Sequence, residues 1–376
     1  MNRTRTIFLA VSVTVVMLFS GVLLASRNSQ DILFRALGNL AEVVHLIETE
    51  YVDELNQEAL STSLDAGLVE SLERSAAVLP SDQIGAYLEY VESPPPYGVG
   101  LTSRLGSAAV LYVLSGSPAE AAGLSEWEVI ELVEGVNSRG RPMWQIRLEL
   151  MDRRNKGLPV TLTVFDREVD ERREVVLEPS EWAPRAATAE LHDEGTVIKV
   201  ELIQEGAVKD IIDLVPDDGR LVLDLRETRW GLETEAITLA DSFVVEGVLG
   251  EWKGRRAGSQ SYKATTKIKT PAMPVVLIGP RTEGIGEILA AALQRNGATL
   301  VGDRTVGRAP YMSLVRDGDV AVWMPVGQWL RADEEPINGN GIEPDEKVEV
   351  GGGEGSVDAA LQRALDLLGG ELEKAA

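Results

Sequence analysis

The chain has 376 residues, 44% of them hydrophobic, which is enough to bury the cores of two or three modest domains. Its formal net charge of -24 argues against a nucleic-acid partner, because a strongly acidic surface repels a phosphate backbone. Cysteine is absent, which excludes disulfides and thiolate chemistry, and the two histidines, His45 and His192, lie far apart. We therefore expect both histidines to be structural, and we predict neither a metal site nor a cofactor.

The N-terminal segment, residues 1–27, is predicted to act as a membrane anchor or signal segment. Arg3 and Arg5 precede residues 7–25, a stretch without a formal charge that is about long enough to cross a bilayer. The nearest candidate cleavage site has bulky Leu23 where a small residue is usual, so we expect an uncleaved anchor, with a cleaved signal peptide as the alternative. With the arginines held inside, the chain from Ser26 onward would lie in the cell envelope, on the periplasmic side of the inner membrane.

A helical region is predicted over residues 28–92. Apolar residues recur at helical spacing over 32–51, and a second helical pattern covers 58–72. We expect these helices to form a small packed bundle. The Ser-Pro-Pro-Pro run at 93–96 then interrupts the chain, because proline fixes φ and removes a backbone donor.

A compact β-rich domain is predicted over residues 93–180. Strands are expected over 110–113, 129–133, 159–165 and 173–177. The sequence Gly-Ser-Pro-Ala-Glu-Ala-Ala-Gly-Leu predicts a turn and a short helix, and a longer helix is expected over 143–151.

Strands and helices alternate over residues 181–350. Strands are expected over 197–202, 221–225, 275–278 and 299–301, with helices over 236–243 and 288–294. Because this alternation implies parallel strands covered by helices, the fold class is α/β here and α+β over the whole chain. A glycine-rich linker and an amphipathic helix are expected over 351–376.

Residues 274–308 resemble the catalytic stretch of the tail-specific, or C-terminal processing, serine peptidases. In that family a Ser-Ala-Ser-Ala-Ser-Glu-Ile turn carries the nucleophile as its middle serine, and a later Thr-Phe-Gly-Lys-Gly carries the general base. The resemblance places Gly284 at the nucleophile position and Arg308 at the lysine position. Glycine has no side chain and a guanidinium group stays protonated, so neither residue can perform that chemistry. We expect Arg308 to pair with a carboxylate such as Glu283 or Glu287.

The resemblance also implies an altered oxyanion turn. The family's Leu-Asp-Leu-Arg-Asn-Asn-Pro-Gly-Gly has its counterpart at 223–231, where Trp230 replaces the first glycine of the pair and Gly231 keeps the second. Thr282 is the nearest surviving hydroxyl, and Ser313 is the only serine between Ser261 and Asp345. A relocated nucleophile would have to be Thr282 or Ser313.

Other family motifs persist over the stretch that resembles the family, roughly residues 32–350. They are found at 223–226, 287–288, 301–302, Thr305 and 340–345. None of them needs to touch a substrate, so we expect them to hold the fold.

Residues 93–180 resemble a PDZ domain, which binds peptide C-termini by strand addition. The run that resembles its carboxylate-binding strand is Tyr97, Gly98, Val99, Gly100 and Leu101. The family's Pro-Gly-Asp turn is Glu126-Trp127-Glu128 here, and Trp127 lacks the freedom of glycine at positive φ. An exposed tryptophan at this turn would favour a protein partner, and a buried one would indicate packing.

The sequence thus predicts an anchored extracytoplasmic homologue of C-terminal processing peptidases that does not cleave. Its expected partners are peptide C-termini or unfolded segments, an active peptidase paralogue, or further copies of itself. One alternative is an active serine endopeptidase that uses Thr282 or Ser313. The other is a structural envelope protein whose own side chains fill the groove beside 97–101. The acidic run 333–335 lacks the spacing of a cation-binding loop and is expected to be a solvated turn.

Overall fold

The computed structural model describes residues 35–375 of the chain. By the contacts made within each, the chain divides into two compact units, 1–62 and 63–376. The residues left out of that range are 37, 51–56, 71, 74, 266–269, 271, 319 and 349–357. The predicted membrane segment, residues 7–25, lies outside the described residues. Within the described part, no helix combines the length and apolar character needed to cross a bilayer. The described residues of 35–50 are helical, and α2 spans Gln57–Glu70, as the periodicity predicts.

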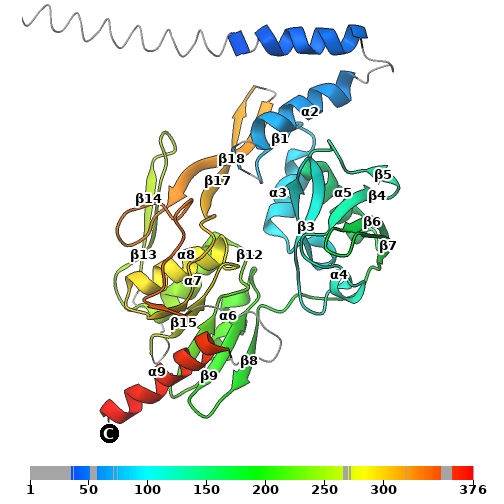
Figure 1. Cartoon of the computed structure of the whole chain (residues 1–376). Helices are drawn as coiled ribbons and strands as arrows, with labels where there is room; N and C mark the ends of the chain where they lie inside the picture. The colour runs from blue at the N-terminus through cyan, green and yellow to red at the C-terminus, as the bar shows by residue number, and fades with distance from the viewer. Residues whose placement is uncertain are drawn as a thin grey trace, which may run out of the picture. The chain divides into compact units, whose positions relative to one another are not determined.

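A six-stranded antiparallel sheet forms the core of residues 96–177, which we call the middle region (Figure 1). The strand order is β2-β3-β4-β6-β7, with β5 paired to β4. The strands are β2 Val99–Arg104, β3 Ser107–Val113, β4 Val129–Val133, β5 Val136–Asn137, β6 Val160–Asp166 and β7 Glu171–Leu177. Along β6 the side chains of Val160, Leu162 and Val164 are fully buried and alternate with less buried neighbours, as expected for a half-buried strand.

Short helices cover this sheet. They are η1 Pro96–Gly98, α4 Pro118–Ala121 and α5 Met143–Asn155. Helix α5 buries Ile146, Leu150 and Met151, and the first two belong to the same core cluster as the sheet. The Ser117 side chain accepts a hydrogen bond from the Glu120 backbone N–H, which caps α4.

A mostly parallel sheet forms the centre of residues 187–375, which we call the C-terminal region. The order is β19-β16-β15-β11-β9-β8, and only the β8–β9 pair within this sheet is antiparallel. The strands are β8 Ala187–Leu191, β9 Thr196–Val200, β11 Leu221–Asp224, β15 Val275–Ile278, β16 Leu300–Gly302 and β19 Glu346–Lys347. The predicted parallel strands are thereby confirmed.

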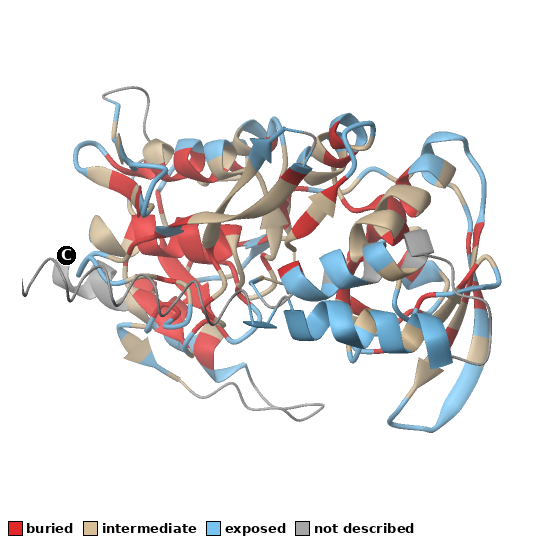
Figure 2. Ribbon diagram, turned by 90° about the horizontal axis from the view of Figure 1, so that it is seen from above, coloured by how far each residue is buried: buried red, intermediate tan, exposed pale blue. Residues whose placement is uncertain are grey.

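Helices lie on both faces of this sheet, as the two core clusters on its opposite sides show. Buried residues are concentrated in part of the molecule (Figure 2). The helices are α6 Ala207–Ile212, α7 Glu233–Phe243, α8 Ile285–Arg295 and α9 Ala359–Ala375. Successive residues of β11 point to opposite faces: Leu223 packs in the core cluster that contains α7 and α8, and Val222 packs in the cluster that contains α9. A buried parallel sheet needs apolar residues on both faces, which explains the continuous apolar runs in the sequence.

Two further groups of strands outside that sheet were not anticipated. A five-stranded antiparallel sheet has the order β1-β18-β13-β14, with β17 paired to β18, and β10 pairs with β12 in parallel. The elements are β1 Ala77–Leu79, α3 Ile84–Glu92, β10 Leu202–Ile203, β12 Trp230–Gly231, β13 Val248–Lys253, β14 Ser259–Lys263, β17 Pro310–Asp317 and β18 Val320–Trp329. The predicted α/β class is confirmed, since helices and several sheets alternate along the chain.

Candidate active site

The turn between β15 and α8 is the segment that resembles a nucleophile turn. Gly284 caps the N-terminus of α8 with φ 57° and ψ -106°, a conformation that strains any other residue. A β-carbon at this position would still fit, because the nearest atoms are the carbonyl oxygens of Arg229 and Arg308, each 3.7 Å away. Strained strand-to-helix turns present nucleophiles in other hydrolases. Here the turn has the backbone shape of such a nucleophile turn, but Gly284 carries no side chain that could react.

Arg308 forms an ion pair beside this turn. Its Nη1 lies 3.2 Å from Oε1 of Glu283, and both side chains are largely shielded from solvent. This confirms the predicted pairing of Arg308 with Glu283. A guanidinium group held by a carboxylate keeps its proton, so it can neutralise charge but cannot act as a base.

Glu287 ties the turn to the segment that carries Arg308. Its side chain is fully buried, and it accepts hydrogen bonds from the backbone N–H groups of Gly284, Gly307 and Arg308 at 3.2, 2.7 and 2.7 Å. The Thr305 hydroxyl donates a further hydrogen bond to it. Burial raises the pKa of Glu287, and these donors act in the opposite direction. One carboxylate therefore fixes both positions where the family has its catalytic pair.

The two hydroxyls considered as fallback nucleophiles lie in different surroundings. Thr282 is fully buried, and its hydroxyl donates to the carbonyl oxygen of Leu225 at 2.9 Å and accepts from the N–H of Gly279 at 3.0 Å. Ser313 lies on β17, paired with Met324 of β18. The Thr282 hydroxyl thus closes the turn through its main-chain hydrogen bonds, and Ser313 belongs to the antiparallel sheet.

The segment that resembles the oxyanion turn packs tightly against the chain. Gly231 pairs with Ile203 in the two-stranded β10–β12 sheet, and a β-carbon on Gly231 would lie 2.7 Å from the Ile203 carbonyl oxygen. A β-carbon on Gly286 would lie 2.5 Å from the Thr228 carbonyl oxygen. The backbone at Thr228 therefore reaches the first turn of α8 at a distance that only glycine permits. The adjoining Trp230 is half-buried.

A charged cluster joins this segment to the middle region. Arg229 is only 6% exposed, pairs with Glu126 at 3.2 Å, and donates to the carbonyl oxygen of Leu111 at 2.9 Å. Arg281 also pairs with Glu126, and its Nε lies 3.3 Å from a carboxylate oxygen of Glu227. We call Glu126, Glu227, Arg229 and Arg281 the clasp. No sequence spacing indicated it, because Glu126 and Arg281 are 155 residues apart.

The predicted peptide-binding run, residues 97–101, is buried by the protein's own side chains. All five residues are buried, with Tyr97 at 2% and Leu101 at 4% exposure. Arg147 of α5 donates to the Leu101 carbonyl oxygen at 2.8 Å. The Tyr112 ring lies so close that a β-carbon on Gly100 would be 2.3 Å from it. A strand added here would have to displace these side chains.

A second shielded carboxylate, which the sequence reasoning missed, lies in the first turn of α7. Glu233 accepts a hydrogen bond from the indole N–H of Trp329 at 3.3 Å, and burial raises its pKa to about 7. The Tyr311 ring meets that of Trp329 edge-on, with the ring centres 6.4 Å apart. Glutamate is common in the first turn of a helix, so the sequence around Glu233 gives no sign of a shielded carboxylate. Its aromatic neighbours, which are distant in the sequence, are what set it apart from other such glutamates.

The acidic run at 333–335 is held by ion pairs. Asp333 pairs with Arg331 at 2.8 Å, and Glu334 pairs with Lys253 at 3.4 Å. In the described ranges no group of three or more potential metal-ligating side chains comes together.

The family model of peptidase family S41 matches residues 203–348, which include the turn, the clasp arginines and the Arg308 segment. In a solved structure, the photosystem II D1 C-terminal processing protease is similar in fold, with a TM-score of 0.61 and 18% identity. That similarity covers 87% of this chain and 90% of the other.

Several curated proteins match most of the chain, among them the following three. A probable CtpA-like serine protease of Staphylococcus aureus is 24% identical, over 92% of this chain and 71% of its own length. A carboxyl-terminal-processing protease of Synechocystis is 27% identical, over 86% and 81%. A carboxyl-terminal-processing protease of Picosynechococcus is 31% identical, over 72% and 70%. The likeness extends well beyond the site, and the chain belongs to peptidase family S41, the family of the C-terminal processing serine proteases.

Proposed function

We propose that this chain is a non-cleaving member of family S41 that holds protein segments or partner subunits in the cell envelope. The observation that carries the proposal is the pair of positions beside α8. Gly284 offers no nucleophile, and Arg308, paired with Glu283 at 3.2 Å, carries a guanidinium group that cannot accept a proton. The main-chain hydrogen bonds of the Thr282 hydroxyl support the same conclusion.

The proposal includes the domain order and the location. Residues 93–180 would form a PDZ-like domain and residues 181–350 the peptidase-like domain. The uncharged stretch 7–25 supports an uncleaved anchor in the inner membrane, with the remainder on the periplasmic side. An active peptidase paralogue or another copy of the chain would be the partner in a scaffold.

The buried run 97–101 favours scaffolding over the capture of peptide C-termini in that groove. Arg147 and Tyr112 cover the strand to which a peptide would add. This observation also supports a second candidate function, a structural envelope protein without a peptide ligand. The two differ in one respect: a scaffold retains a segment or a partner, and a purely structural protein does not.

The test is proteolysis of an unfolded, tagged protein by the purified full-length chain. We expect no cleavage by the parent, with the substrate retained on it. The Gly284→Ser, Arg308→Lys variant should also be inactive, because Glu283 would keep the new lysine protonated. Adding Glu283→Ala, which restores the family's alanine, should give cleavage about a hundredfold above the parent's background.

Two controls locate any activity of the parent. Thr282→Ala and Ser313→Ala should change nothing if the parent does not cleave. Cleavage by the parent that is lost in either variant would contradict the proposal and identify the nucleophile. An inactive parent that retains neither substrate nor partner would favour the structural role.

A further inference from the structure

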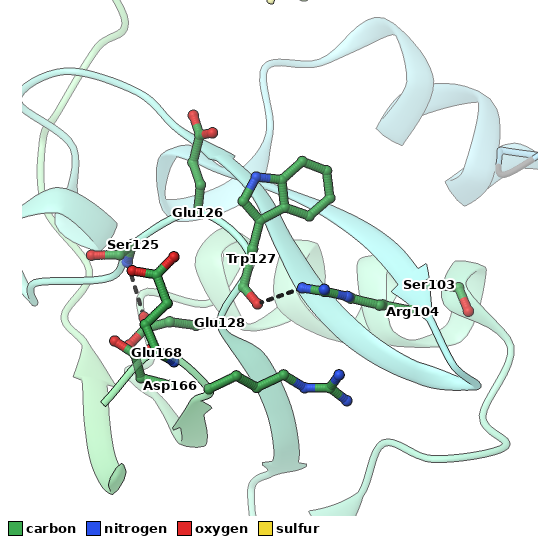
Figure 3. A pocket seen from close by; sticks show the side chains of 9 residues that line it. Ser103, Arg104, Ser125, Glu126, Trp127, Glu128, Asp166 and Glu168 are labelled. Atoms are coloured by element: carbon green, nitrogen blue, oxygen red, sulfur yellow. Dashed lines mark hydrogen bonds between the residues drawn. The ribbon is translucent and has the colours of Figure 1, made fainter. Parts of the chain in front are cut away.

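A pocket with a volume of about 610 Å³ opens on the middle region, and its lining includes no residue of the run at 97–101 (Figure 3). Its walls come from the end of β2, from the turn before β4 and from the β6–β7 turn. The lining includes Arg104, Trp127, Arg167 and Glu168. The space is large enough for a few residues of an extended peptide.

Trp127 occupies the turn of this pocket in a conformation that suits glycine. Its φ is 69°, where a bulky residue is a clear outlier, and 45% of the residue remains exposed. The Arg104 guanidinium lies 5.8 Å from the centre of the indole ring and donates to the Trp127 carbonyl oxygen at 3.4 Å. Strained backbone conformations cluster at functional sites, and exposed tryptophans are frequent in protein interfaces. Trp127 combines both features, as expected of a residue that contacts a partner.

Two of the four carboxylates that line the pocket are paired with arginines outside the lining. Glu126 pairs with the clasp arginines, and Glu128, only 3% exposed, pairs with Arg173 at 2.7 Å. Asp166 accepts a hydrogen bond from the backbone N–H of Glu168 at 2.8 Å.

The guanidinium groups are not matched in the same way. Within the described residues, neither Arg104 nor Arg167 has a carboxylate within ion-pair distance. The Asp166 and Glu168 carboxylates, which have no basic partner among the described residues, are the remaining anionic groups of the pocket against these two cations. On a chain with a net charge of -24, two unpaired guanidinium groups beside an exposed indole form a local site for an anionic group.

We propose that this pocket binds an acidic peptide segment. A carboxylate of the segment would pair with Arg104 and Arg167, and a neighbouring apolar or aromatic side chain would pack on Trp127. The site goes beyond the proposed function, because it needs neither a free C-terminus nor the run at 97–101, and it does not depend on whether the chain cleaves.

The probe is a fluorescein-labelled Gly-Glu-Phe-Glu-Gly peptide with both ends blocked, titrated with the full-length chain by fluorescence anisotropy. The Glu→Gln and Glu→Lys versions of the peptide should bind at least tenfold more weakly. Trp127→Gly should lower the affinity at least fivefold while the protein stays folded, because glycine suits φ 69°. The Arg104→Gln, Arg167→Gln variant should lose at least tenfold.

Arg139→Gln is the matched control, an exposed arginine of the same region that does not line the pocket, and it should bind as the parent does. Glu126 is left unchanged because it belongs to the clasp. Equal affinity for the glutamate and glutamine peptides, or full affinity in Trp127→Gly, would overturn the proposal. Binding that requires an unblocked C-terminus would also overturn it, because it would indicate the groove at 97–101.

Discussion

Two groups of residues around the first turn of α8 differ in how far they retain the features of the family. On one side, Glu287 accepts four hydrogen bonds from the turn and from the segment 305–308, and this arrangement holds the fold. On the other side, Gly284 and the Arg308–Glu283 pair stand where the family places its reactive groups. The scaffold that positions a site and the groups that react in it are thus separable, because they rest on different residues.

Removing the scaffold carboxylate should have the largest effect. Glu287→Ala would leave its four donors without this partner, two in buried and two in part-buried positions, so we expect a loss of about 4 kcal/mol in the free energy of unfolding. Denaturant unfolding followed by circular dichroism measures it. Glu287→Gln is the matched control, which keeps one acceptor oxygen and should lose less. A loss below about 1 kcal/mol in Glu287→Ala would show that the donors find other partners.

The two glycines of the turn should respond differently to the same change. In Gly286→Ala the new methyl group would lie 2.5 Å from the Thr228 carbonyl oxygen, so we expect a loss of about 3 kcal/mol. In Gly284→Ala the nearest atoms are 3.7 Å away, and only the strain at φ 57° remains, about 1 kcal/mol. Thermal unfolding of both variants measures the difference. Equal losses would contradict the close approach of Thr228.

The clasp should depend on its buried arginine. Arg229 and Arg281 both contact Glu126 and Glu227, but their side chains are 6% and 52% exposed. We expect Arg229→Met to lower the free energy of unfolding by about 2 kcal/mol, because buried hydrogen bonds are lost while Arg281 still neutralises Glu126. Arg281→Met should lower it by less than about 0.5 kcal/mol, as for an exposed ion pair. A larger effect from Arg281 would reverse our assignment of the two roles.

The smallest expected effect is on the pH dependence of stability and concerns Glu233, which has fewer hydrogen-bond donors than Glu287. In the described part of the chain, Glu233 accepts one hydrogen bond, from Trp329, and burial raises its pKa to about 7. A carboxyl group with a raised pKa binds its proton more tightly in the folded state, so its stabilising effect is present below its unfolded pKa. That contribution is lost as the pH rises through about 7.

Glu233→Gln should remove this pH dependence. We expect the variant to match the parent at pH 5 and to exceed its stability at pH 8 by about 1 kcal/mol, after allowance for solvent screening. Unfolding curves at the two pH values measure it. Parallel pH profiles for parent and variant would show that Glu233 ionises at its ordinary pKa.

The strands and helices of the parallel sheet were predicted well from the sequence, and the antiparallel strands outside it were predicted poorly. The strand over 275–278 and the helix after it follow from an apolar run and a helical period, and both are present as β15 and α8. The β17–β18 hairpin was missed because its side chains are mostly half-buried, so its strands lack a strong apolar pattern. Pairing of Arg308 with Glu283 or Glu287 could be predicted because the resemblance places Arg308 at the lysine position, which meets the turn that contains both glutamates, and the structure shows the pair with Glu283.

By itself the sequence determined the fold class and the positions along the chain of the apolar runs that form the parallel strands. It also determined which residues stand at the two positions of the family's catalytic pair. These follow from local periodicity and from motif positions, which need no knowledge of distant contacts. Only the tertiary structure decided that the run at 97–101 is covered, that Thr228 reaches Gly286, and that a clasp joins segments 155 residues apart. Burial and close approach depend on which segments the fold brings together, and no spacing along the chain encodes them.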